Sequence, residues 1–235
     1  MDRRHFTFLA LTGATLSGLA LSAAAPALAA KPPAEWDGLV KVKAKKFELV
    51  YLRPGADFRG YTKVILDPTE IAFQKNWQRD YNSDAATLGG RLSDKDVAAM
   101  ADEGRKGAAQ ILQKAYAEGG YPVVAEAGPD VLRVRTALVD ITVTAPDTNT
   151  AMNVQSYSRD AGGATLVVEA RDSLTGALLG RAVDSRTIDD FTMEWRSRVS
   201  NRADFGQQLK TWAKNSVKGL DELKALSPIA AEAGG

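Results

Sequence analysis

The chain contains no cysteine, and its only histidine is His5, near the N-terminus. Without thiols it can form no disulfide, no iron–sulfur cluster and no thiolate zinc site. Beyond His5, nucleophilic catalysis by Ser–His or Cys–His pairs is also excluded. The remaining chemistry is that of carboxylates, hydroxyls, lysines and arginines, or of an oxygen-ligated Ca²⁺ or Mg²⁺. We therefore expect no cofactor and no metal site.

The sequence has almost no surplus of charge, with 30 Lys+Arg against 29 Asp+Glu. This balance gives no basic footprint for nucleic-acid binding and no acidic tail for a polyelectrolyte partner. The one local basic cluster is "KVKAKK" at residues 41–46, which leads directly into an apolar run. We interpret it as an edge strand whose lysines oppose aggregation.

A hydrophobic run of about 20 residues, which a membrane span requires, is also missing. Residues 1–29 instead have the layout of a secretory signal peptide. Arg3 and Arg4 precede a short apolar segment, and Ala27 and Ala29 form an A-x-A site. We predict cleavage after Ala29 and a periplasmic or secreted product. "RRHF" partly matches a twin-arginine signal, so the general and the twin-arginine export routes both remain open.

After a flexible leader over residues 30–46, the hydrophobic pattern predicts one α+β domain over 47–226 and a frayed tail over 227–235. Alternation of apolar and polar residues indicates strands. A change of phase in the third strand predicts a β-bulge near Leu138. The segment 69–77 fits either a further strand or a short helix. The predicted strands are 47–52, 61–67, 131–144, 164–173 and a return strand after the turn at Thr175-Gly176.

Two long helices are predicted, one before and one after the last three strands in the sequence. The first is capped by Ser93, has a stripe of small residues that includes Gly104, and ends at the "EGGYP" sequence. The second runs over residues 202–226 with Asn201 as its cap. We expect a mostly antiparallel sheet of about five strands with both helices packed on one face.

The segments "YLRPGADFRGYTKVILDPTEIAF", "LSDKDV" and "YPVVAEAGPDVLRVRTALVDI" resemble a family of bacterial envelope proteins. It is the domain-of-unknown-function family 3313, and the resemblance runs from about Phe47 to Asp184. Many members look like lipoproteins with a cysteine at the cleavage site, which this chain lacks, so membrane tethering is not implied. The resemblance implies an envelope-localised α+β domain and no catalytic residue set.

The stretch 51–77 holds the most suggestive side chains. Asp67 and Glu70 are weak catalytic candidates, because paired carboxylates can hydrolyse glycosidic bonds, while the other reading makes them a strand end and a surface residue. Aromatics at strand spacing fit either a core or a ligand groove, and Arg with Trp is a common interface pairing. The candidate binding residues are Arg53, Asp57, Tyr61, Trp77, Trp195 and Arg196.

Two polar segments are longer than a compact domain needs. Residues 78–92 carry Asp80, Asn82 and Asp84 but lack the spaced ligands of a calcium-binding hand. Residues 145–163 fit either a disordered loop or a partner-binding arm.

Three functions remain open for this chain. We favour a non-enzymatic exported binding or assembly module whose partner is an envelope protein or a small ligand. The alternatives are a carboxylate-dependent hydrolase of envelope glycans, and a carrier that holds a small ligand between sheet and helices. The sequence names neither the partner nor the oligomeric state.

Overall fold

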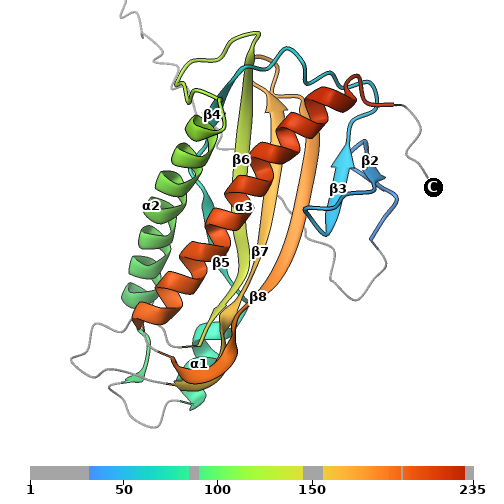
Figure 1. Ribbon diagram of the computed structural model, residues 1–235. Helices are drawn as coiled ribbons and strands as arrows, with labels where there is room; N and C mark the ends of the chain where they lie inside the picture. Colours follow the sequence, from blue (N-terminus) through green and yellow to red (C-terminus); the bar gives the residue numbers. More distant parts are fainter. Residues whose placement is uncertain (1–31, 85–89, 145–155, 197, 231–235) are drawn as a thin grey trace, which may run out of the picture. The chain divides into compact units, whose positions relative to one another are not determined.

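The computed structural model describes residues 32–84, 90–144, 156–196 and 198–230, of which 156–161 and 189–201 are described by their backbone alone. One compact unit covers Pro33–Gly235. In it, two long helices lie on one face of a single eight-stranded sheet (Figure 1). The expected α+β class is confirmed, as are the two long helices on one face.

The sheet is larger than expected and mixed rather than mostly antiparallel. Its order is β1-β2-β3-β8-β7-β6-β4, and β5 also pairs with β6. The prediction of about five strands did not include the short strands β1 and β2 near the N-terminus, and it left β5 open as a further strand or a short helix. The strands are β1 (Glu35–Trp36), β2 (Leu39–Val42), β3 (Leu49–Leu52), β4 (Lys63–Leu66), β5 (Glu70–Phe73), β6 (Val131–Val143), β7 (Ser156–Asp172) and β8 (Leu178–Arg196).

Two kinds of pairing meet at β6. On one side β6, β7 and β8 pair antiparallel, and a tight turn in which Gly176 has φ +72° joins β7 to β8. On the other side β4 and β5 run parallel to β6. Parallel neighbours need a long crossover connection, and α2 supplies it. The predicted bulge is present two residues late, because the β6–β7 register shifts between Val139 and Thr142.

α2 (Asp94–Glu118) begins and ends as its sequence predicts. Ser93 and Asp96 form a capping box, and Gly119 follows the last turn. Its small-residue stripe faces the sheet: a Cβ on Gly104 would contact Ile71 of β5 at 3.5 Å. Small residues therefore let this helix approach the strands closely.

α3 (Arg198–Leu226) starts earlier than expected, so Asn201 lies inside the helix and is not its cap. Residues 69–77 satisfy both readings, since β5 is followed by the short helix α1 (Trp77–Asp84). That helix covers residues 78–84 of the polar loop expected over 78–92, and residues 85–89 lie outside the described part of the chain. Residues 156–163 of the second expected loop belong to β7, and residues 145–155 lie outside the described part of the chain.

Both ends of the expected domain are more ordered than predicted. Residues 35–36 and 39–42, placed in a flexible leader, form β1 and β2 at the sheet edge. In the expected tail, Ile229 is 8% exposed and exchanges backbone hydrogen bonds of 2.8 and 2.9 Å with the turn at Gly55 and Ala56. Residues 231–235 lie outside the description.

The main core lies between the helices and the sheet. Because side chains alternate along a strand, Leu132 and Val134 of β6 point toward the helices, and Arg133 and Arg135 point to the opposite face. No helix in the described segments is both long and apolar enough to cross a bilayer.

Candidate ligand-binding cavity

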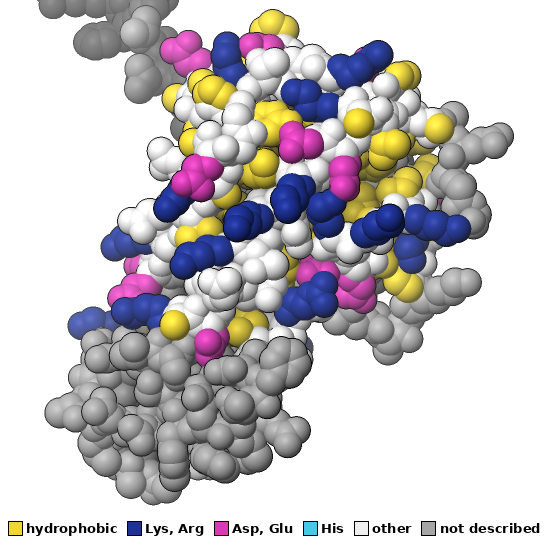
Figure 2. All heavy atoms as spheres, viewed as in Figure 1, with side chains coloured by type: hydrophobic (Ala, Val, Ile, Leu, Met, Phe, Trp, Pro, Cys, Tyr) yellow, Lys and Arg dark blue, Asp and Glu magenta, His cyan; other side chains and the backbone are white. Residues whose placement is uncertain are grey.

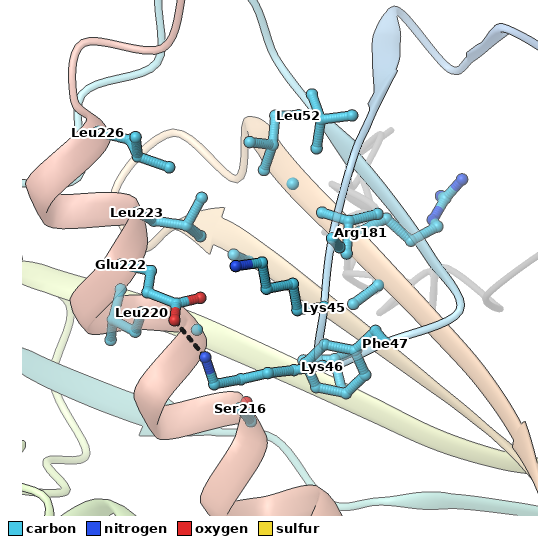
Figure 3. Close-up of a pocket in the computed structure, with 18 of the residues that line it drawn as sticks. Lys45, Lys46, Phe47, Leu52, Arg181, Ser216, Leu220, Glu222, Leu223 and Leu226 are labelled. Atoms are coloured by element: carbon cyan, nitrogen blue, oxygen red, sulfur yellow. Dashed lines mark hydrogen bonds and ion pairs between the residues drawn. The ribbon is translucent and has the colours of Figure 1, made fainter.

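A cavity of about 600 Å³ lies between the sheet and the C-terminal part of α3 (Figure 3). We call it the α3 cavity. Strands β2, β3, β6, β7 and β8 supply its floor, and α3 forms one wall from Ser216 to Leu226. The β2–β3 connection, residues 43–48, closes the other side, and we call it the lysine loop. The interior is mainly aliphatic, with Val50, Leu132, Val134, Val168, Leu220 and Leu223 among its side chains.

The cavity exists because small residues face each other across it. Ala170 and Ala182 present only methyl groups from neighbouring strands. Gly180 is constrained by its neighbour, since a Cβ there would come within 3.0 Å of Leu52 Cδ2. Gly219, on α3, is not constrained: the nearest atom to a Cβ there would be Phe47 Cε2, at 3.9 Å. A larger side chain at position 219 would therefore occupy the cavity.

Three contacts hold the second half of the lysine loop. The Glu48 backbone N–H donates to Asp184 Oδ1 at 3.0 Å. Asn215 Nδ2 donates to the Lys46 carbonyl at 3.4 Å, and the Lys46 ammonium forms an ion pair with Glu222 of α3 (Figure 3). The first half of the loop, residues 43–45, is exposed.

Asp184 is the buried charge that fixes this arrangement, with 1% of its surface exposed. Its carboxylate accepts hydrogen bonds from Trp212 Nε1 at 2.8 Å and from Arg186 Nε and Nη2 at 2.8 and 3.0 Å, besides that from Glu48. A buried carboxylate is tolerated when it is paired and hydrogen-bonded in this way. Asp184 thus ties β8 to α3 and to the lysine loop.

A hydroxyl pair crosses the deep end of the cavity. The Tyr116 hydroxyl of α2 lies 2.5 Å from Ser216 Oγ of α3. Tyr116 is 2% exposed, and this burial raises its pKa to about 12 because the ionised phenolate would be poorly solvated. The pair is therefore a neutral contact between the two helices at neutral pH.

A second cavity, of about 340 Å³, lies between α2, the N-terminal half of α3, and strands β5 to β7. We call it the α2–α3 cavity. Glycines open it from both helices: Gly104 and Gly107 on α2, and Gly206 on α3. Its charged lining residues, Glu103 and Arg202, form an ion pair with each other.

The face of the sheet opposite the helices carries a network of charges. Glu169, 2% exposed, pairs with Arg171 at 2.8 Å and with Arg181 at 2.7 Å. Arg181 also pairs with Asp37 at 2.8 Å and lies over the Trp36 ring, 4.0 Å from its centroid. These mutual contacts fasten β1 to the sheet.

The two catalytic candidates lie on this opposite face. Asp67 is 3.5 Å from Arg133 Nε and 3.6 Å from Arg135 Nε, and Glu70 is 3.4 Å from Arg135 Nη2. Neither lines the α3 cavity or the α2–α3 cavity. The structure brings both carboxylates to one arginine rather than to a cleft.

Two of the candidate binding residues hold the "RPGAD" turn. Arg53 Nε donates to the Leu178 carbonyl at 2.5 Å. Asp57 accepts hydrogen bonds from the Arg59 side chain and backbone, which lower its pKa to about 2. Neither residue lines the α3 cavity.

The aromatic candidates that the structure describes belong to the packing. Tyr61 is 8% exposed and donates to Asp172 at 2.8 Å; burial and that hydrogen bond raise its pKa well above the usual range. Trp77 is buried and stacks on Phe73, with ring centroids 4.9 Å apart. Trp195 and Arg196 lie at the end of β8, where the side chains are outside the description.

Reasoning from the sequence allowed a ligand between the sheet and the helices, but none of the candidate binding residues lines the α3 cavity. The "KVKAKK" cluster was interpreted as an edge strand, but only residues 41 and 42 are in β2 and the other four open the lysine loop. The one available signal was a run of cations between two apolar strands, next to a hydrophobic helix face. The small residues Ala170, Ala182 and Gly219 are separated in the sequence and give no pattern.

Comparisons with known proteins give a family but no activity. The family described as "Protein of unknown function (DUF3313)" matches residues 33–216. No curated protein has a significantly similar sequence. Among solved structures, the PelC dodecamer from Paraburkholderia phytofirmans has 14% identity and a TM-score of 0.36, covering 73% of this chain and 95% of that one. A neuraminyllactose-binding hemagglutinin homolog from Helicobacter pylori has 10% identity and the same TM-score, covering 74% and 92%. Similarity at this level says nothing about a shared role.

Proposed function

We propose that this chain, which belongs to the DUF3313 family of proteins of unknown function, is an exported binding protein that holds a small apolar ligand in the α3 cavity. Its action is binding rather than catalysis. The alternative of a carboxylate-dependent hydrolase has less support, because Asp67 and Glu70 are ion-paired on the opposite face of the sheet.

The observation that carries the proposal is the size and lining of the cavity. Natural protein interiors are packed as densely as organic crystals, so a space of about 600 Å³ over the main core is not explained by packing alone. Ligand sites are typically concave, mainly apolar and about 300–1,000 Å³ in volume. The α3 cavity has all three properties.

Export follows in this proposal from residues 1–29. Arg3 and Arg4, the apolar segment, and the site at Ala27 and Ala29 have the layout of a signal that is removed on secretion. The mature protein would then work in the periplasm or outside the cell, where it would meet molecules of the envelope.

The test uses two glycines of the same helix. N-Phenyl-1-naphthylamine, an uncharged apolar fluorophore, should bind the purified protein with increased fluorescence. Gly219→Leu fills the α3 cavity and should abolish this signal. Gly206→Leu fills the α2–α3 cavity and should leave it unchanged, since a Cβ at Gly206 meets nothing within 4 Å.

Circular dichroism and thermal melting of both variants would establish that they fold. If the fluorophore does not bind the wild-type protein, or if Gly219→Leu folds and binds it as well as wild type, the proposed function is wrong. Native mass spectrometry of protein from its own envelope would show the mass of a retained ligand.

A further inference from the structure

The two ends of the α3 cavity differ in chemistry. The deep part is lined by aliphatic side chains of the sheet and of α3, whereas three of the four residues at positions 43–46 of its mouth are lysines. The space-filling view shows basic side chains in a band across this face, with hydrophobic side chains beside them (Figure 2). A ligand that matches the whole cavity needs an apolar part and a separate anionic part.

The charges at the mouth do not balance. Among the described residues that line the cavity, Glu222 is the only acidic one, and it pairs with Lys46. Arg181 also lines the cavity, but its guanidinium points away from it and pairs with Glu169 and Asp37 (Figure 3). The cation of the lysine loop that remains for a ligand is therefore Lys45.

Lys45 is the cation best placed to receive a ligand. It has no ion-pair partner among the described residues, and its side chain extends toward α3 over the mouth (Figure 3). Lys46 is held by an exposed ion pair, and 60% of the Glu222 side chain is accessible. Such pairs are weak, so an incoming anion can replace the Glu222 carboxylate. Lysine stems also cover apolar surface while keeping the charge in water.

We infer that the ligand is a single-chain amphiphile with an anionic head group, a carboxylate or a phosphate. Its chain lies between α3 and the sheet, and its head group meets Lys45 and Lys46 at the mouth. This inference rests on the proposed function, because it assumes that the α3 cavity is a binding site. An edge-strand role of the lysines against aggregation would predict no effect of head-group charge on binding.

The experiment measures displacement of N-phenyl-1-naphthylamine by compounds that share one chain. Dodecanoate and dodecyl phosphate are the anions, dodecanol is the neutral match, and dodecyltrimethylammonium is the cation. We expect both anions to displace the fluorophore at concentrations about tenfold lower than dodecanol, as charge-assisted contacts would give. High salt should reduce this advantage. The tighter of the two anions identifies the head group.

Variants of the loop then separate charge from shape. Lys45→Ala with Lys46→Ala should remove about tenfold of the affinity for the anions and leave dodecanol unchanged. Lys214→Ala with Lys218→Ala, two exposed lysines of α3 outside the cavity lining, should change neither.

Equal displacement by dodecanol and dodecanoate would overturn the inference, as would loop variants that weaken both equally. Displacement by dodecanol alone would leave the cavity as an apolar site and reject only the anionic head group. Failure of the fluorophore to bind at all would instead contradict the proposed function.

Discussion

The α3 cavity and the α2–α3 cavity lie under the same helix but are built differently. Both are apolar and both are opened by a glycine of α3, at positions 219 and 206. The α2–α3 cavity has one cation and one carboxylate, which neutralise each other across the two helices. The α3 cavity is bordered by a loop with three lysines and by one carboxylate. The two cavities therefore differ in the charge at their edges, and our proposal of a binding site for the α3 cavity depends on this difference as well as on its volume.

The loop also makes the two cavities differ in how they open. The described lining of the α2–α3 cavity comes from regular helices and strands, whose backbone hydrogen bonds hold them in place. The α3 cavity is closed by a connection of six residues, of which 43–45 are exposed and Lys46 and Glu48 are held by hydrogen bonds. Loops with few buried contacts open at low free-energy cost. A ligand would enter more easily on the lysine-loop side.

Asp184 holds Trp212, which lines the α2–α3 cavity, and the lysine loop, which borders the α3 cavity. Of the substitutions considered, its replacement should lower the stability most. Asp184→Ala leaves Trp212 Nε1 and the Glu48 N–H without an acceptor. We expect the free energy of unfolding to fall by about 3 kcal/mol. This is the low end of the usual cost of breaking a buried ion pair, because the Arg186 side chain is half exposed. Urea unfolding measures it.

The control is Asp221→Ala, which removes an exposed carboxylate that accepts from the Tyr121 hydroxyl at 2.6 Å. It should cost about 1 kcal/mol. If both variants lose the same amount, Asp184 does not hold the loop and α3 together as described.

The hydroxyl pair of Tyr116 and Ser216 lines the α3 cavity and not the α2–α3 cavity. The titration of Tyr116 should make its contribution to stability depend on pH. Tyr116→Phe should cost about 1 kcal/mol at neutral pH, because Ser216 loses its partner. In the wild type, the folded-state pKa of Tyr116 is about 12 against an ordinary 10.0. The neutral phenol therefore contributes stability below pH 10 that is lost as the pH rises toward 12.

Because the Phe variant lacks this titration, it should lose less stability than the wild type between pH 10 and 12, by roughly 2 kcal/mol at most. Urea unfolding of both proteins through this range gives the difference. Curves that stay parallel would show that Tyr116 is not shielded from water.

The smallest effect should come from alanine at the two α3 glycines. Gly219→Ala and Gly206→Ala add a methyl group where the nearest neighbour lies at 3.9 Å or beyond 4 Å. Each should stabilise the protein by up to about 1 kcal/mol, because alanine favours the helix interior. Thermal melting of the two variants compares the cavities directly, and destabilisation by either would mean that its cavity has less room than the geometry gives.

Local signals predicted the helices well. Ser93 and the glycines after Glu118 mark both ends of α2, and the capping geometry is the expected one. The start of α3 was misjudged because Asn201 is a good cap residue in a helix that continues past it toward residue 198. The short strands β1 and β2 were placed in a flexible leader because so few residues show no clear alternation of apolar and polar side chains. Pairing decides their conformation, since β2 pairs with β3 and β1 pairs with β2.

The candidate site could not be predicted in the same way. Asp67, Glu70 and the aromatics of residues 51–77 attracted attention because they are chemically conspicuous and close in the sequence. The structure instead holds Asp67 and Glu70 at Arg135, and packs Trp77 on Phe73. The cavity depends on small residues at positions far apart in the sequence. Such scattered residues form no recognisable sequence pattern.

By itself the sequence determined the α+β class, the family, the caps of α2 and the exclusion of thiol chemistry and, beyond His5, of imidazole chemistry. These depend on residue identity and on neighbours within a few positions. Only the tertiary structure decided that residues 43–46 and Gly219 of α3 border one cavity with Ala170 and Ala182 of the sheet. The reason is that strand pairing and helix packing join positions more than a hundred residues apart, and the space left between them is a property of the packed chain.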